Sequence, residues 1–244
     1  MSRILPILSV LAVVVSFIGG FFLANALNKK ELEELRRENA RLKAEQRSSS
    51  LSDEEIRSKI EQADKRPDDF SFQKGLGIAL YRYSVIEQNP QYLPDVLRLL
   101  ERAANLNPLD FETQVALGDV NLDLAQITKD NSKYERARQF YQRALQIKPE
   151  DADTQSSVAL TYLLADPADY DKAIEELKKA LAAQPNHERS LEIMVRALVA
   201  KGDKEAASEY LDKLKKINPQ NPVIKELVET LSICISNTSP GATL

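Results

Sequence analysis

The sequence predicts an all-α protein in which pairs of helices repeat along the chain, preceded by an N-terminal transmembrane helix. Pro108, Pro149, Pro185 and Pro219 recur at nearly regular intervals, and each ends a similar pattern of small and large apolar residues. Glycine is rare, at 7 of 244 residues, and tryptophan is absent, a composition that favours helices over strands. The third observation is that residues 4–27 contain no charged side chain.

The uncharged run at residues 4–27 is long enough to cross a bilayer as a helix. A cleaved signal peptide is the alternative, because Ala24-Asn25-Ala26 has the A-x-A form of a cleavage site. The run exceeds the roughly 7–15 apolar residues of a signal peptide. We therefore predict a retained anchor over residues 1–27.

Residues 28–51 follow the anchor and are mostly polar. Leu35 and Leu42 fit the d positions of a heptad, and Leu32 and Asn39 fit its a positions, so the segment is a candidate coiled coil in a parallel homodimer. It holds only about two and a half heptads, fewer than the three or four that identify a coiled coil. A solvated juxtamembrane helix and linker is the alternative.

Two further helices are expected to cover the ends of the repeats. Ser52 and Glu55 form a capping box at the start of a helix over residues 52–66. Residues 223–236 form a second apolar helix, and residues 237–244 are expected to be a disordered tail. Such terminal helices are needed because the end repeats of a solenoid otherwise expose apolar faces.

Residues 67–222 repeat a pattern of apolar residues in four units. Large and small residues recur three or four positions apart, which places them on one face of each of two helices per unit. The small positions of the first helices are Gly77, Gly118, Ala159 and Val195, and those of the second helices are Val96, Ala137, Ala173 and Ala207. Small residues let paired helices approach closely, and the proline after each unit stops the second helix.

This pattern resembles the tetratricopeptide repeat (TPR), a helix-turn-helix unit of about 34 residues. The resemblance is strongest in the last two units, where Tyr170-Asp171-Lys172-Ala173 carries the expected turn and small residue. The first two units hold extra residues near Val85–Gln91 and Gln126–Ser132, where Asn89-Pro90 and Lys129-Asp130-Asn131-Ser132 predict polar turns. The resemblance implies a right-handed superhelical solenoid in which the first helix of every unit lines a concave groove that binds a protein or peptide.

By this resemblance, a set of residues on the first helices forms a candidate peptide-binding groove. They are Lys74, Ile78, Arg82, Glu112, Val115, Asp119, Leu122, Asp123, Asp153, Ser156, Leu160, Leu163, Leu164, Arg189, Glu192 and Arg196. The middle of the set is acidic beside an apolar strip, which predicts a basic partner with an apolar anchor. We expect Asp119 and Asp123 to face solvent. Related proteins grip a terminal carboxylate with Lys, Arg and Asn, and most positions here differ, which argues against that mode of binding.

The sequence offers no catalytic, cofactor or metal site, and we predict that the protein is not an enzyme. Its only histidine, His187, follows Pro185 in a predicted loop, with no cysteine or second histidine to complete a site. The single cysteine, Cys234, lies in an apolar helix and cannot form a disulfide framework. The net charge of -4 argues against nucleic acid as a partner.

Together these features predict a membrane-tethered adaptor or assembly scaffold that acts through its groove. The alternative is a chaperone, because the arrangement also resembles the membrane-bound TPR subunits of bacterial c-type cytochrome maturation, which hold an apocytochrome. Either function places the protein in the cell membrane with a single span. Basic residues after the anchor, among them Lys29, Lys30, Arg36 and Arg37, favour a cytoplasmic repeat domain, whereas the chaperone requires a periplasmic one.

Overall fold

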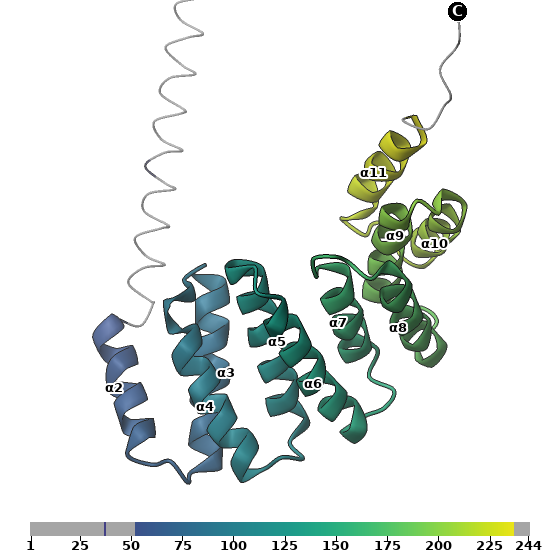
Figure 1. The fold of residues 1–244 in the computed structure, drawn as a ribbon. Coiled ribbons are helices and arrows are strands. Elements are labelled where there is room, and N and C mark those ends of the chain that lie inside the picture. The colour runs from purple at the N-terminus through teal and green to yellow at the C-terminus, as the bar shows by residue number, and fades with distance from the viewer. Residues whose placement is uncertain (1–36, 38–51, 237–244) are drawn as a thin grey trace, which may run out of the picture. The chain divides into compact units, whose positions relative to one another are not determined.

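The computed structural model describes residue 37 and residues 52–236, and for residues 234–236 the backbone alone (Figure 1). The chain divides into two units after Ser58, and all the repeated helix pairs lie in the second unit. The predicted anchor, the candidate coiled coil apart from Arg37, and the tail at residues 237–244 lie outside the described residues.

The predicted localisation is corrected by the described helices. Within residues 37 and 52–236, none is both long enough and apolar enough to cross a membrane. The prediction of a single-pass protein of the cell membrane, with its repeats on the cytoplasmic or the periplasmic side, needs such a helix and is not retained. The run at residues 4–27 lies outside the described residues.

The first well-described helix, α2 (Asp53–Asp64), begins with the capping box read from the sequence. The Ser52 backbone N–H donates to Glu55 Oε2 over 2.8 Å, and the Glu55 N–H donates to Ser52 Oγ over 3.2 Å, so two free donors at the helix start are satisfied. At the other end, the Gln73 amide donates to the Ala63 carbonyl over 2.7 Å and to the Arg66 carbonyl over 2.9 Å. These bonds tie the end of α2 to the start of the next helix.

Four antiparallel helix pairs follow, coloured from blue to green in Figure 1. The pairs are α3 (Phe70–Ile86) with α4 (Leu93–Leu106), α5 (Phe111–Thr128) with α6 (Asn131–Ile147), α7 (Ala152–Leu163) with α8 (Tyr170–Ala183), and α9 (Glu188–Lys201) with α10 (Lys204–Ile217). A last helix, α11 (Ile224–Ser236), packs on α9 and α10. The all-helical, solenoid-like fold predicted from the repeated pattern is confirmed.

Aspartates start most of these helices. The side chains of Asp69, Asp110, Asp151, Asp169 and Asp203 each accept a hydrogen bond from a backbone N–H in the first turn. An aspartate at this position satisfies an otherwise free donor and complements the positive end of the helix dipole. The boundaries of the pairs are therefore encoded locally in the chain.

Two glycines on first helices explain how closely the pairs pack. A Cβ atom at Gly77 would lie 2.8 Å from the Leu100 side chain, and one at Gly118 would lie 2.3 Å from the Tyr141 ring. Both distances are shorter than van der Waals contact, so any larger residue would push the second helix away. The large partners, Leu100 and Tyr141, are fully buried in the space that the glycines leave.

The first helices of the pairs also contact one another. Within the described residues, α3 contacts α5, α5 contacts α7, α7 contacts α9 and α9 contacts α11, whereas no contact of similar extent joins α4, α6, α8 and α10. The first helices therefore lie closer together than the second helices and form the inner layer of the stack. We call the surface that they present the inner face.

The first two pairs depart from the regular repeat where the sequence contains extra residues. Helices α3 and α5 have 17 and 18 residues, against 12 in α7 and 14 in α9. A 3-10 turn, Pro90–Tyr92, fills the connection from α3 to α4. Of the second insertion, only residues 129 and 130 lie between helices, because Asn131 and Ser132 already belong to α6 rather than to the predicted turn. The extra residues thus lengthen the first helices and their connections at one end of the inner face.

Candidate protein-binding site

The centre of the inner face carries a carboxylate held by a tyrosine from a second helix. Tyr141, on α6, is fully buried, and its hydroxyl donates to Asp119 Oδ1 on α5 over 2.7 Å. The ring reaches Asp119 because it crosses α5 at Gly118, where there is no side chain to block it. The same close approach that packs the pair therefore also positions Asp119.

A second carboxylate lies one helical turn further along α5. Asp123 is on the same face as Asp119, and its Oδ2 accepts a hydrogen bond of 2.8 Å from the Tyr81 hydroxyl on α3. This bond joins two successive repeats across the inner face. We call Asp119 and Asp123 the aspartate pair.

Both members of the aspartate pair are only partly exposed, although the sequence led us to expect that they face solvent. Burial raises the pKa of Asp119 to about 6, with a smaller contribution from the charge of Asp123, while the hydrogen bond from Tyr141 and the charge of Arg189 act against the shift. Burial also raises the pKa of Asp123, against the hydrogen bond from Tyr81. The two carboxylates are thus poorly solvated and repel each other.

Among the described residues, no Lys, Arg or His forms an ion pair with either member of the aspartate pair. By contrast, the acidic groups toward the start of α5 are paired. Lys74 lies 2.9 Å from Asp110 and 2.9 Å from Glu112. The positive charge of Lys74, a predicted groove residue, is therefore already compensated by carboxylates of the chain.

The arginines on α9 are also engaged. Arg189 donates to the Asp153 carbonyl over 2.8 Å and to Ser157 Oγ over 3.1 Å, and its guanidinium lies 3.6 Å from the Asp153 carboxylate. Arg196 forms a pair of 2.7 Å with Glu226 on α11. The aspartate pair therefore keeps negative charge that no ion pair within the described residues compensates, although the charge of Arg189 acts on Asp119.

Several predicted groove residues serve packing instead of lining an open surface. Leu122 is buried in a cluster with Ala125 and Tyr134, and Ser156 is buried with its hydroxyl 2.6 Å from that of Ser190. Leu160 and Leu163 pack partly on the core formed by α8, α9 and α10. The predicted apolar strip is therefore less open than its sequence suggests, because helices of the next repeat cover it.

Other predicted groove residues are less buried. Ile78, Val115 and Glu192 are partly buried, Arg82 and Leu164 are exposed, and Glu192 accepts a hydrogen bond of 2.8 Å from the Asn221 amide. The structure thus brings Asp119, Asp123 and their tyrosines together, and separates them from the charged groups that pair at either end.

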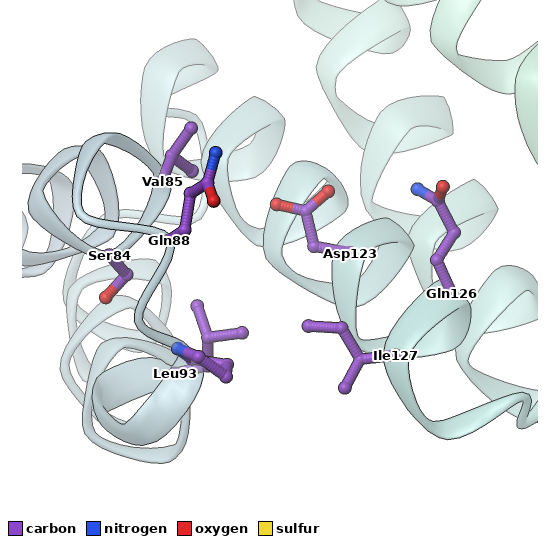
Figure 2. Close-up of a pocket in the computed structure, with 8 residues that line it drawn as sticks. Ser84, Val85, Gln88, Leu93, Asp123, Gln126 and Ile127 are labelled. Atoms are coloured by element: carbon purple, nitrogen blue, oxygen red, sulfur yellow. The ribbon is translucent and has the colours of Figure 1, made fainter.

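A cavity next to the aspartate pair was not predicted. It has a volume of about 370 Å³ and opens between the ends of α3 and α5 (Figure 2). Its lining consists of Ser84, Val85, Gln88, Pro90, Leu93, Asp123, Gln126 and Ile127. Most of these residues belong to the two insertions, within which the sequence predicted polar turns at Asn89-Pro90 and at residues 129–132. Valine and isoleucine within those insertions were the signal that could have revealed it.

His187, Ser190 and Asp153 lie close together and have the residue types of a catalytic triad. His187 Nδ1 lies 2.7 Å from Ser190 Oγ, and its Nε2 lies 3.4 Å from the Asp153 carboxylate. However, Ser190 has 0% of its surface exposed, so a substrate cannot reach its hydroxyl. Within the described residues there is also no group of three or more His, Cys, Asp or Glu side chains that could hold a metal ion.

The stacked helix pairs and the surface on their first helices define an α-helical repeat protein. Family models described as tetratricopeptide repeats match two parts of the chain, residues 118–151 and residues 164–231. Proteins built from such repeats are typically interaction scaffolds for protein or peptide partners, not enzymes.

Solved structures have a similar fold. The crystal structure of MamA superposes with a TM-score of 0.55, at 21% identity over 68% of this chain and 87% of that one. A tetratricopeptide repeat protein from Parabacteroides merdae gives a TM-score of 0.52, at 17% identity over 68% of this chain and 61% of that one. At these identities the likeness concerns the fold alone.

One curated relative has a higher sequence identity. Protein PHOX3 of Arabidopsis thaliana is 30% identical over 102 residues, which make up 40% of this chain. The matched region spans only 13% of that plant protein. The similarity therefore concerns a small part of a much longer chain.

Proposed function

We propose that this protein is an adaptor that binds a segment of a partner protein along its inner face. The aspartate pair determines which segments bind. The proposal rests on the two partly buried carboxylates that have no ion-pair partner within the described residues, on a face where the neighbouring charges are paired. A lysine or arginine from a partner would supply the missing cation.

The chemistry of the aspartate pair favours a basic partner over other ligands. Each carboxylate already accepts one tyrosine hydroxyl, which orients it while leaving acceptor capacity free. Poorly solvated carboxylates gain more from a charge-assisted hydrogen bond than exposed ones, because they give up less hydration on binding. An ion pair between a partner cation and these carboxylates contributes mainly to the selectivity of binding and to the association rate.

Two other predicted groove residues are open to a bound segment. Arg82 on α3 and Leu164 at the end of α7 are both exposed. No contact among the described residues supports the chaperone role in c-type cytochrome maturation. We therefore propose the adaptor function only.

The proposal can be tested by removing charge while keeping the hydrogen bonds. In a chain carrying Asp119→Asn and Asp123→Asn, the amide oxygens still accept from Tyr141 and Tyr81, but both negative charges are gone. We expect the full-length variant, used as bait in cells of the source organism, to lose the partners that the wild-type chain recovers in quantitative mass spectrometry.

The matched control carries Glu135→Gln and Glu209→Gln, which remove two exposed charges from the second helices α6 and α10. It should recover the same partners as the wild-type chain. If the asparagine variant also recovers an unchanged set while its thermal unfolding shows that it is folded, the inner face is not the binding surface.

A further inference from the structure

The cavity beside the aspartate pair is built largely by residues outside the regular repeat. Val85, Gln88 and Pro90 come from the first insertion, and Gln126 and Ile127 from the second. These residues have no counterpart in the shorter helices α7 and α9. The cavity is thus not a general property of stacked repeats.

The walls of the cavity are apolar side chains that remain open to solvent. Val85 is 53% exposed and Ile127 is 55% exposed, and buried Leu93 forms part of the lining. Figure 2 shows Ile127 and Asp123 of α5 across an open space from Leu93, Val85 and Gln88. Covering exposed apolar walls with another apolar group is favourable because it removes their surface from water.

The size of the cavity limits what it can take. Ligand pockets commonly measure about 300–1,000 Å³, and this cavity of about 370 Å³ lies at the lower end of that range. It suits one large side chain, or two small ones, better than an extended cofactor.

Asp123 is common to the cavity and the aspartate pair, since its carboxylate belongs to the lining. Within the described residues its hydrogen-bond partner is Tyr81, a neutral group, and burial raises its pKa. An anionic ligand would be repelled here. A purely apolar ligand would cover the carboxylate further without supplying a cation, at a desolvation cost.

We propose that this cavity receives one large apolar side chain of a partner protein segment, and that a lysine or arginine close by in the same segment pairs with Asp123. The inference rests on the proposed adaptor function and specifies its partner. The apolar side chain provides most of the affinity, and the cation determines which segments bind. The amides of Gln88 and Gln126 lie at the same opening and can bond to the backbone of the segment.

The test uses phage-displayed random nonapeptides, selected on the immobilised full-length chain. Enriched peptides are synthesised with a fluorescent label, and their affinities are measured by anisotropy. We expect them to share a Leu, Ile, Met or Phe with a Lys or Arg within about one helical turn or two strand positions.

Two variants remove the apolar walls one at a time, Val85→Gln and Ile127→Gln. Both replace exposed side chains, so neither is expected to disturb folding. Each should weaken binding of the enriched peptides by roughly tenfold, which is about the effect of losing one well-buried apolar contact. The matched control is Ile86→Gln, next to Val85 and 70% exposed but outside the lining, and it should stay within about twofold of wild type.

The outcomes separate this inference from the adaptor function. Peptides that depend on Asp119 and Asp123 but bind Val85→Gln and Ile127→Gln as tightly as wild type would overturn the cavity as a docking site and leave the adaptor function standing. Failure to enrich any peptide would overturn both. A dimer in sedimentation that Val85→Gln dissociates would show that a second copy of the chain fills the cavity, and the inference would also fall.

Discussion

The Tyr81 hydroxyl on α3 donates a hydrogen bond of 2.8 Å to Asp123 on α5, and so joins the first repeat to the second through a carboxylate of the inner face. This single contact links stability to function. It fixes the orientation of one member of the aspartate pair, and it depends on the stacking of adjacent repeats.

Tyr81→Phe should lower the free energy of unfolding by about 1–3 kcal/mol, because a partly buried carboxylate loses its hydrogen-bond donor. It should also raise the pKa of Asp123 further, since the tyrosine bond favours the charged form. Urea denaturation measures the first effect. Tyr170→Phe is the control, because the Tyr170 hydroxyl makes no hydrogen bond to the described residues, and its stability should be close to that of wild type.

Gly118→Ala should destabilise the protein by at least roughly 1–3 kcal/mol, the usual range for overpacking a core. A Cβ there would lie 2.3 Å from the ring of Tyr141, which is fully buried and has no room to move. Gly75→Ala is the opposite case, because a Cβ there meets nothing within 4 Å. That change should raise the unfolding free energy by about 0.5–1 kcal/mol, the usual gain of alanine over glycine in a helix. Equal effects at the two sites would contradict the packing described for α5 and α6.

Asp119 should make the protein less stable as the pH rises. Its pKa in the folded chain is about 6, above the value of about 3.9 expected for an unfolded chain. Between these two pH values the folded state binds more protons than the unfolded state, so the contribution of Asp119 to the unfolding free energy falls as pH increases. Below about pH 4 both states are protonated and the penalty vanishes.

The comparison with Asp119→Asn isolates this effect from other carboxylates, several of which have lowered pKa values. We expect the asparagine variant to gain stability relative to wild type between pH 4 and pH 6.5, as measured by denaturation at each pH. A difference that does not change with pH would mean that Asp119 titrates normally.

The affinity for a partner should depend on the same ionisation of Asp119. Ionisation lowers the stability of the fold, but it should increase the affinity. A cationic side chain stabilises the charged form of Asp119, so affinity should rise from pH 5 to pH 7 and binding should release Asp119-bound protons near pH 6. Calorimetry in buffers of different ionisation enthalpy detects this release. Proton release that persists in Asp119→Asn would place its source elsewhere.

The helices and their pairing could be predicted from sequence because their determinants are local. Small residues at fixed spacing, such as Gly77 and Gly118, reveal where a second helix approaches, and the first-turn hydrogen bonds of Asp110 and Asp151 mark where helices begin. The repeat period also shows which helices come first in each pair, and hence which face is available for binding.

The environment of the aspartate pair could not be predicted in this way. Asp119 and Asp123 have the spacing of a solvated helix face. Only in the folded chain does the Tyr141 ring cross α5 at Gly118 to reach Asp119, and only there does Tyr81 of the preceding repeat reach Asp123. The cavity was missed for a related reason. Its residues interrupt the repeat, so the repeated pattern of small and large apolar residues carried no information about where they lie.

The most direct test of the central claim asks which face of the repeats touches a partner. A photoreactive benzoylphenylalanine is placed at Arg82, exposed on α3 beside the inner face, or at Gln139, exposed on the second helix α6. The full-length chain is irradiated in cells, and the crosslinked proteins are identified by mass spectrometry. We predict crosslinks from position 82 that disappear when Asp119→Asn and Asp123→Asn are introduced, and none of the same partners from position 139. Crosslinks to those partners from position 139 alone would contradict the account.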